Sequence, residues 1–281
     1  MDMSSKKELN ILDSLALLYP ESSKNTLKKW IRAKRVLINN QKVADFDTVV
    51  KEGAKISLGT KKEFCHWDIE ILYEDKDVIV IHKPAGLLSV ATDTENFRTA
   101  HDYLKRRAKG RSVYPVHRLD KDTSGVMVFA NNQASRAHLK EQFEKHSIYR
   151  EYRAIVYGHI EQKKGRWESY LIEDSTYKMH ETTQAEGAKL AITDYEVLKE
   201  TRALSLMRFV LKTGKKNQIR VQAAHRGHPL LGDSKYGREN ETFKKLALHA
   251  IALDFIHPTK EKLLKFSTPF PKELSELFTS K

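Results

Sequence analysis

The first sixty residues place apolar side chains at helical spacing and then in short strand-like runs. Leucines and isoleucines recur at near-helical intervals until Pro20, which cannot continue a helix. Ser22 and Ser23 are good capping residues for a second helix. The paired asparagines Asn39 and Asn40 predict the turn of a hairpin. The predicted elements are a helix over 11–20, a helix over 22–33, a hairpin over 36–43 and a strand over 55–58.

Beyond residue 68, short apolar runs with strand spacing alternate irregularly with helical patterns. The run Val126–Ala130 is apolar at every position, which predicts a buried strand. No regular strand–helix–strand period is present, so the pattern favours an α+β fold with a largely antiparallel or mixed sheet and flanking helices. Strands are predicted over 70–75, 78–82, 126–130, 148–158, 204–211 and 246–255, and helices over 99–108, 135–146 and from about 217.

The charged segment 60–67 separates these two patterns and reads as a linker. We therefore expect two domains, a small α/β domain over 1–62 and a larger one over 63–281. Residues 1–62 hold 13 Lys and Arg against 7 Asp and Glu. The whole chain carries a formal net charge of +13, which indicates a polyanionic partner, with nucleic acid as the default.

Cysteine and histidine usage narrows the class further. The single cysteine, Cys65, cannot form an internal disulfide, so we expect a reducing, cytoplasmic compartment. The twelve histidines show no metal-binding spacing, and no glycine pattern of a nucleotide-binding loop occurs, so we expect neither metal nor cofactor. The polar N-terminus and the lack of an apolar run of about 20 residues predict no signal segment and no membrane span.

One loop concentrates the candidate chemistry. Residues 117–125 read His-Arg-Leu-Asp-Lys-Asp-Thr-Ser-Gly and feed directly into the buried strand, so a rigid element holds the carboxylate of Asp120. One interpretation is a turn in which Asp120 and Thr123 only bond local backbone. A second, a hydrolase using Ser124, fails because Ser124 lacks the Gly-x-Ser-x-Gly elbow.

This loop resembles the central motif of RluA-type pseudouridine synthases, and further matches follow in that family's order over about residues 68–271. They are Lys83-Pro84-x-Gly86, Tyr152-x-Ala154, Gln218-Ile219-Arg220-Val221 and Gly227-His228-Pro229-x-x-Gly232-Asp233. The resemblance implies isomerisation of uridine to pseudouridine in structured RNA, without cofactor or metal.

The resemblance also implies roles for individual residues. Asp120 is expected to be the essential carboxylate and Arg220 the cation that keeps it ionised. Tyr152 is expected to stack on the uracil and help remove the proton from ring carbon five, with Ile219 either closing the other face or simply packing. Arg118 corresponds to the residue that fills the gap left by a flipped base. Substrate contacts are also expected at His117 and Thr123.

The N-terminal segment resembles an S4-type RNA-binding domain over about residues 9–59. The basic helix, the sequence Val-x-Ile-Asn-x-x-x-Val and the later Gly-x-x-Ile carry this likeness. It implies that Lys28, Lys29, Arg32 and Arg35 contact RNA phosphates. A solvated basic helix face without a partner is the alternative.

Together, the two resemblances predict an enzyme that acts on large-subunit ribosomal RNA of the 23S type, as a monomer and without a membrane partner. Transfer RNA as substrate, and a non-catalytic RNA-binding assembly factor, are the alternatives. The chain departs from the family at Gly214-Lys215-Lys216-Asn217-Gln218, where Gly-Arg-x-His-Gln is common, and at Gln222, where His is usual. These changes are expected to alter RNA or structural contacts and to leave the Asp120–Arg220 pair intact.

Overall fold

The computed structural model describes residues 3–4, 9–32, 35–43, 45–59, 69–92, 95, 98–239 and 241–278. The chain forms two compact units, Met1–Trp67 and Asp68–Lys281. The predicted boundary between residues 62 and 63 lies outside the described residues. Among those residues, no helix has both the length and the apolar character that crossing a membrane requires.

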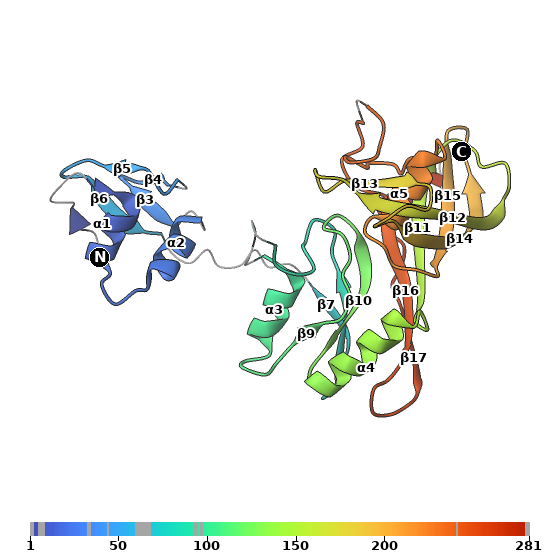
Figure 1. Ribbon diagram of the computed structural model, residues 1–281, viewed down its shortest axis with the longest axis horizontal. Helices are drawn as coiled ribbons and strands as arrows, with labels where there is room; N and C mark the ends of the chain where they lie inside the picture. Colours follow the sequence, from blue (N-terminus) through green and yellow to red (C-terminus); the bar gives the residue numbers. More distant parts are fainter. Residues whose placement is uncertain are drawn as a thin grey trace. The chain divides into compact units, whose positions relative to one another are not determined.

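The first unit packs two helices against short strands (Figure 1). Asn10 caps the first helix by accepting a hydrogen bond from the Asp13 amide at 2.8 Å. Leu15, Leu27 and Ile31 are fully buried between the helices and the sheet. The strands run in the order β1-β6-β3-β4, and β2 pairs with β5. The elements are β1 (Met3–Ser4), β2 (Leu9–Asn10), α1 (Ile11–Leu18), α2 (Lys24–Arg32), β3 (Val36–Ile38), β4 (Gln41–Lys42), β5 (Val49–Val50) and β6 (Lys55–Leu58).

The second unit is built on one long sheet in the order β13-β12-β14-β15-β11-β16-β10-β8-β7, with β17 beside β16 and β9 beside β10. Its strand pairs are antiparallel except β10–β16, which is parallel. The α+β class with a largely antiparallel, mixed sheet is therefore confirmed. The strands are β7 (Glu70–Glu74), β8 (Val78–Lys83), β9 (Tyr114–Pro115), β10 (Ser124–Ala130), β11 (Tyr149–Tyr157), β12 (Lys164–Glu173), β13 (Met179–Thr182), β14 (Lys189–Glu200), β15 (Leu204–Leu211), β16 (Leu248–Ile256) and β17 (Leu263–Ser267).

The helices α3 (Ala100–Arg107), α4 (Gln133–Glu144) and α5 (Gln218–His225) lie at the two ends of the long sheet, which gives this unit two halves. Figure 1 shows α3 and α4 beside β7, β9 and β10, whereas α5 lies beside β12 and β13. Thr99 and Asn132 cap α3 and α4 through side-chain oxygens, as expected where a polar residue precedes an amphipathic run. The short helices α6 (Lys272–Ser275) and η1 (Glu276–Phe278) follow the last strand. In the second unit, β9, β12, β13, β14 and β17 are strands in addition to those predicted from the sequence.

Candidate active site

The register of the central strands brings the 117–125 loop and Tyr152 to the same level of the sheet. Gly125 of β10 and Tyr152 of β11 both pair with Ala250, on opposite sides of β16. Gly125 has a φ of 122°, and a Cβ there would lie 2.1 Å from the Ala250 carbonyl oxygen. Only glycine therefore allows β10 to approach β16 at this point. A β-bulge between Glu151 and Tyr152 alters the register just before the tyrosine.

Asp120 accepts hydrogen bonds from two residues that begin α5. The Arg220 Nη1 atom lies 3.2 Å from Asp120 Oδ2, and the Asn217 Nδ2 atom lies 2.5 Å from the same oxygen. The Asp120 side chain keeps 24 % of its surface exposed, whereas the Arg220 side chain keeps 9 %. The carboxylate is thus within reach of a bound molecule while the cation beside it is buried. The expected Asp120–Arg220 pair exists in the structure.

Arg220 is itself held by a second carboxylate. Its Nε and Nη2 atoms donate to the two oxygens of Asp233 at 2.8 and 2.7 Å, which is the two-pronged geometry of a strong ion pair. Burial alone lowers the pKa of Arg220, but the bonds and charges of Asp233 and then Asp120 outweigh it and raise that pKa. Burial also raises the pKa of Asp233, and Arg220 reverses the effect and lowers it. Both groups therefore stay charged.

Asn217 supplies a contact that the sequence did not predict. It precedes α5 with φ 52°, in the left-handed region that Asn tolerates better than most residues. Its side-chain nitrogen, Nδ2, donates to Asp120, and its side-chain oxygen, Oδ1, accepts from the Tyr236 hydroxyl at 3.1 Å. The Tyr236 hydroxyl in turn accepts from the Met179 amide at 3.0 Å. The departure from the family pattern at position 217 thus falls on a direct neighbour of Asp120.

Two buried glutamines fix α5 against β14. Gln218 donates to the Ile192 carbonyl and the Thr193 hydroxyl at 3.1 and 2.8 Å. Gln222, one turn later, accepts from the same hydroxyl at 2.6 Å and donates to the Ala191 carbonyl at 3.0 Å. Both side chains are satisfied in the interior, as buried amides must be. Gln222 therefore has a structural role, in agreement with the expectation for this departure.

Tyr152 lies at the edge of the hydrophobic core that also contains Ile219. The ring is half-buried and packs against this core, in which Ile219 is 3 % exposed. Burial raises the pKa of Tyr152 to about 12; the charge of Arg150 lowers it and that of Asp120 raises it. The tyrosine is accordingly protonated at neutral pH, and the charge of Asp120 acts on it.

The other three residues suggested by the motif differ in where they lie. Arg118 is exposed. The His117 ring stacks on Phe143 at 4.6 Å and its Nε2 atom accepts the Val128 amide at 3.1 Å. Burial, followed by the charge of Arg150, lowers the pKa of His117 to about 3, so the ring is neutral. Thr123 is 2 % exposed. His117 and Thr123 thus lie on the inner side of the loop.

Lys83 hydrogen-bonds the backbone of the 117–125 loop. Its side chain is fully buried, and Nζ donates to the carbonyl oxygens of Pro84, Leu87 and Lys121 at 3.0, 2.7 and 3.0 Å. Burial lowers the pKa of Lys83 to about 7, and the charges of Asp122 and Asp120 oppose that shift. The Lys-Pro-x-Gly match marked Lys83 as a family position. It did not indicate that the Lys83 ammonium group connects the loop after β8 to the 117–125 loop.

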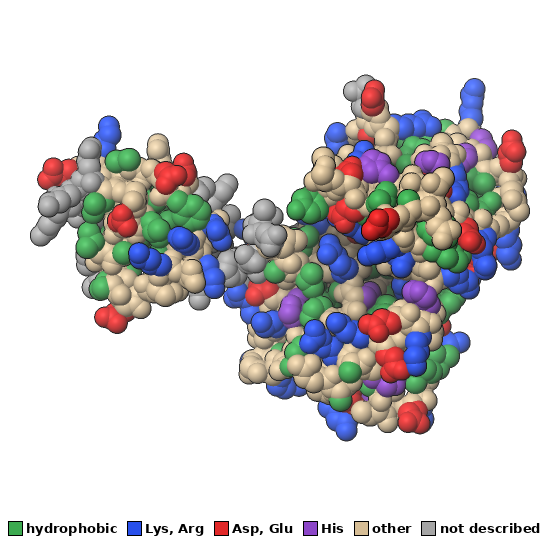
Figure 2. All heavy atoms as spheres, viewed as in Figure 1, with side chains coloured by type: hydrophobic (Ala, Val, Ile, Leu, Met, Phe, Trp, Pro, Cys, Tyr) green, Lys and Arg blue, Asp and Glu red, His purple; other side chains and the backbone are tan. Residues whose placement is uncertain are grey.

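The second unit is hollowed on one face. Figure 2 shows this hollow between its two halves, with Lys and Arg side chains on both sides. A partly exposed carboxylate, a buried guanidinium and a half-buried tyrosine are groups that suit a nucleotide substrate.

Comparison with known proteins decides the family. Residues 77–225 match the family model described as RNA pseudouridylate synthase. Ribosomal large subunit pseudouridine synthase D of Pasteurella multocida is 33 % identical over 94 % of this chain and 88 % of its own length. The chain belongs to the RNA pseudouridylate synthase family. Its members are isomerases, and the resemblance to RluA-type enzymes is confirmed.

Two further relatives agree with this assignment. An uncharacterized RNA pseudouridine synthase of Bacillus subtilis, YhcT, is 31 % identical over 92 % of this chain and 88 % of its own length. The structure of human RNA pseudouridylate synthase domain containing 4 superposes with a TM-score of 0.62 and 26 % identity, covering 73 % of this chain and 90 % of the human one. The catalytic fold of the family is therefore present here.

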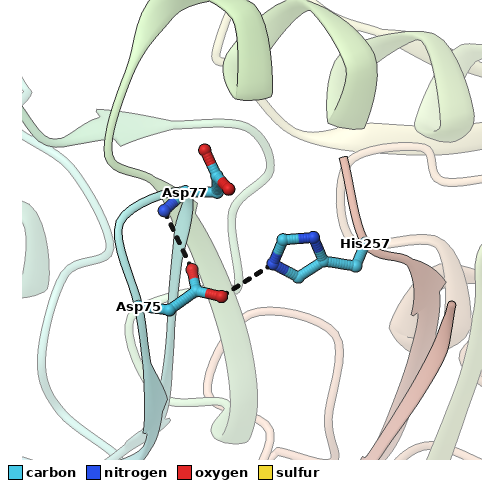
Figure 3. A group of neighbouring side chains, drawn as sticks. All are labelled: Asp75, Asp77 and His257. Atoms are coloured by element: carbon cyan, nitrogen blue, oxygen red, sulfur yellow. Dashed lines mark hydrogen bonds and ion pairs between the residues drawn. The ribbon is translucent and has the colours of Figure 1, made fainter. Parts of the chain in front are cut away.

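This pseudouridine synthase also contains one group of side chains that could hold a metal ion, away from Asp120. Among the described residues, Asp75, Asp77 and His257 offer ligand atoms within 4.8 Å of one another (Figure 3). Asp75 Oδ2, however, accepts from His257 Nε2 and Lys260 Nζ, both at 2.8 Å. Asp77 accepts from Asn132 and Thr259 at 2.9 and 2.6 Å. The carboxylates are satisfied by these donors, so the cluster joins the β7–β8 turn to the turn after β16.

The first unit of the synthase presents basic side chains along α2. Lys28, Lys29 and Arg32 are exposed, and the Arg32 guanidinium lies 5.4 Å from the Phe46 ring centroid. Arg35 is half-buried, and its Nε donates to the Gly59 carbonyl at 3.4 Å. Three of the four expected phosphate contacts are thus accessible, whereas Arg35 is partly used to close its own domain.

Proposed function

We propose that this enzyme isomerises specific uridines to pseudouridine in large-subunit ribosomal RNA. The names of several close relatives, ribosomal large subunit pseudouridine synthase D in a range of bacteria, support this substrate class. The basic net charge of +13 suits a large, structured RNA. Transfer RNA is the alternative substrate of the same reaction.

The single observation that carries the mechanism is the environment of Asp120. Its carboxylate is partly exposed and hydrogen-bonded to a buried guanidinium, which places a fixed positive charge beside one of its oxygens. In our proposal Asp120 is the essential group, whether it attacks the sugar, attacks the ring or removes a sugar proton. Arg220 and Asn217 orient it by bonding one oxygen, Oδ2, which leaves Oδ1 available to the nucleotide.

The target uridine must leave its helix to reach this carboxylate. Base flipping costs a few kcal/mol, and contacts in the pocket must offset that cost. We assign the stacking role to Tyr152, with Ile219 beneath the other face of the base. Exposed Arg118 fills the vacated position in the RNA stack. With its hydroxyl protonated at neutral pH, Tyr152 can relay the proton of ring carbon five, which the hydroxyl oxygen takes up as its own proton passes to solvent water.

His117 and Thr123 receive a different role from the one first expected. Both lie on the inner side of the 117–125 loop, and His117 bonds the backbone of β10. We propose that they position the loop and do not contact substrate. The N-terminal unit is proposed to be an S4-type RNA-binding domain whose exposed Lys28, Lys29 and Arg32 contact phosphates.

The Asp120→Asn variant tests the proposal on in-vitro-transcribed large-subunit ribosomal RNA. The variant removes one charge with little change in shape, so RNA affinity should stay within about twofold of wild type while pseudouridine formation falls below detection. Pseudouridine in the RNA is measured after nuclease digestion by mass spectrometry. Full activity of the variant refutes the role of Asp120. A wild-type enzyme that modifies only transfer RNA moves the assignment to the alternative substrate.

A further inference from the structure

Arg150 is a buried cation without an anionic partner. It lies on β11, two residues before Tyr152, and is 7 % exposed. Its Nε and Nη2 atoms are buried and have no hydrogen-bond acceptor. Within the described part of the chain, no Asp or Glu forms an ion pair with it. Buried guanidinium groups in proteins normally have a carboxylate or several acceptors, as Arg220 does, so this one calls for an explanation.

The neighbours of Arg150 are aromatic or basic. The guanidinium carbon lies 5.8 Å from the centroid of the Phe143 ring. Its positive charge depresses the pKa of two histidines, His117 and His146, in each case after the larger effect of burial. Lys215 adds a further positive charge at His146. The contact with Phe143 offsets only part of the desolvation cost, because a ring face attracts a cation more weakly than an anion does.

An exposed glycine lies directly beside the Arg150 guanidinium. Gly214, in the loop before α5, is exposed, and a Cβ built on it would lie 2.4 Å from Arg150 Nη1. Gly214 does not have a positive φ, so the backbone conformation does not demand glycine here. Any side chain at this position would push against the guanidinium or cover it. The absence of a side chain leaves Nη1 next to the surface, beside the basic residue Lys215.

Arg150 lies near the residues to which the proposed function assigns the reaction. The charges of Arg150 and Asp120 both act on the Tyr152 hydroxyl, with opposite signs. Arg150 also acts on His117, at the start of the loop that carries Asp120. A negatively charged group that reached Arg150 over Gly214 would therefore lie near the nucleotide that Tyr152 and Asp120 contact.

We propose that Arg150 binds a phosphodiester group of the substrate RNA next to the target uridine, through the opening over Gly214. Arginine suits phosphate oxygens, and Nη1, the guanidinium nitrogen nearest Gly214, is the donor that a phosphate reaches from that side. The free enzyme carries a desolvated charge that the RNA neutralises, so the interaction is made only when the substrate is seated. This inference rests on the proposed function, since it takes the ligand to be the RNA that is modified.

The Arg150→Met variant separates this role from a structural one by the sign of its effect on stability. Methionine fills a similar volume without charge, so the melting temperature of the free protein should stay the same or rise. In the Asp120→Asn background, affinity for the large-subunit ribosomal RNA transcript should fall roughly ten-fold. The slope of log affinity against log salt should fall by about 0.7 to 0.9, the value for one lost phosphate contact. Arg150→Lys, which keeps the charge, should retain most of the slope.

Arg166→Met is the matched control, because Arg166 is exposed and paired with Asp194 on β14, at 2.6 Å. It removes one positive charge from the same unit and should change neither the affinity nor the slope. If Arg150→Met lowers the melting temperature and leaves the slope at its wild-type value, Arg150 is a packing residue and the inference is overturned. Failure of the wild-type enzyme to make pseudouridine would instead refute the proposed function. The comparison of RNA affinities would still test whether Arg150 binds a phosphate.

Discussion

Asp233 accepts two hydrogen bonds from Arg220, at 2.8 and 2.7 Å, whereas Asp120 accepts one from it, at 3.2 Å. The guanidinium is therefore oriented chiefly by the more deeply buried of the two carboxylates. Asp233 is 2 % exposed and also accepts the backbone amides of Lys235 and Tyr236, each at 2.9 Å. A rigid buried pair thus presents the Nη1 atom of Arg220 to Asp120.

Replacing Asp233 with Asn should therefore damage both stability and catalysis. The neutral amide leaves Arg220 as a buried charge with one weak partner, which should cost about 3 kcal/mol in the free energy of unfolding. Loss of orientation at Arg220 should lower kcat about 100-fold. Urea denaturation and single-turnover kinetics at a temperature where the variant is folded measure the two effects.

Glu181→Gln is the control for this variant. Glu181 binds Arg226 through two bonds, at 2.9 and 3.1 Å, at the other end of α5. Its loss should reduce stability without changing kcat. A wild-type kcat in Asp233→Asn would show that Arg220 needs no such support.

Asn217→Asp should change the pH dependence of the reaction. Asn217 Nδ2 lies 2.5 Å from Asp120 Oδ2, so the variant places two carboxylates at hydrogen-bond distance. Two such groups share a proton, and the pair loses this proton and gains its second negative charge only at higher pH. The acidic limb of the kcat/KM profile should move upward by about one pH unit or more, so that the variant loses activity at a higher pH than the wild type as the solution is acidified.

Asn217→Gly tests whether that effect is electrostatic. Glycine tolerates the left-handed φ of 52° and removes the donor without adding charge. It should lower kcat while leaving the acidic limb where it is in the wild type. An unshifted profile in Asn217→Asp would mean that Asp120 is not the group whose ionisation the reaction requires.

Asp75 should contribute stability that is lost in acid. Burial raises the pKa of its carboxyl, but the bonds from Lys260 and from the amides of Val78 and Asp77 outweigh burial and lower the pKa below its usual value of 3.8. A depressed pKa stabilises the fold above 3.8 and ceases to do so as the pH falls below it. Asp75→Asn should cost about 2 kcal/mol near neutral pH, and the difference from wild type should shrink below pH ~4.

Equilibrium urea unfolding across this pH range checks the prediction. Glu273→Gln serves as comparison, because its pair with Lys245 is exposed on both sides and should contribute little at any pH. A constant difference between wild type and Asp75→Asn down to strongly acidic pH would contradict the proposed role of the charge.

The exposed basic face of α2 should determine part of the salt dependence of RNA binding. Combined replacement of Lys28, Lys29 and Arg32 by Ala removes three charges without touching the core residues Leu27 and Ile31. The slope of log affinity against log salt should fall by about 2, at roughly 0.7 per phosphate contact. Pseudouridine formation at saturating RNA should be unchanged.

A triple variant of the catalytic unit, Lys140, Lys262 and Lys265 to Ala, removes the same charge from exposed positions and gives the comparison. If both triple variants reduce the slope equally, the N-terminal unit has no special part in binding and only the net charge matters. That outcome would remove the support for an S4-type role.

The sequence by itself determined α1 to α5 and the buried strand after the 117–125 loop, and its likeness to a family indicated the pairing of Asp120 with Arg220. Helix spacing and capping are local properties, and α3 and α4 begin where Thr99 and Asn132 allow. The Asp120–Arg220 pair is separated by 100 residues, and only the family motifs indicated it. Periodicity alone carried no information about that contact, because it depends on how β10, β11 and β16 align.

The tertiary structure decided what surrounds the pair. Asp233 and Asn217 converge on Arg220 and Asp120 from different loops, and Arg150 lies unpaired beneath Gly214. It also turned His117 and Thr123 inward, where the sequence suggested substrate contacts. Burial and the partners of a charge are set by long-range packing, since a side chain is desolvated by segments distant in the chain. For that reason the motif indicated the reaction, whereas the fold determined which charged side chains have hydrogen-bond partners and which, like Arg150, have buried nitrogens without one.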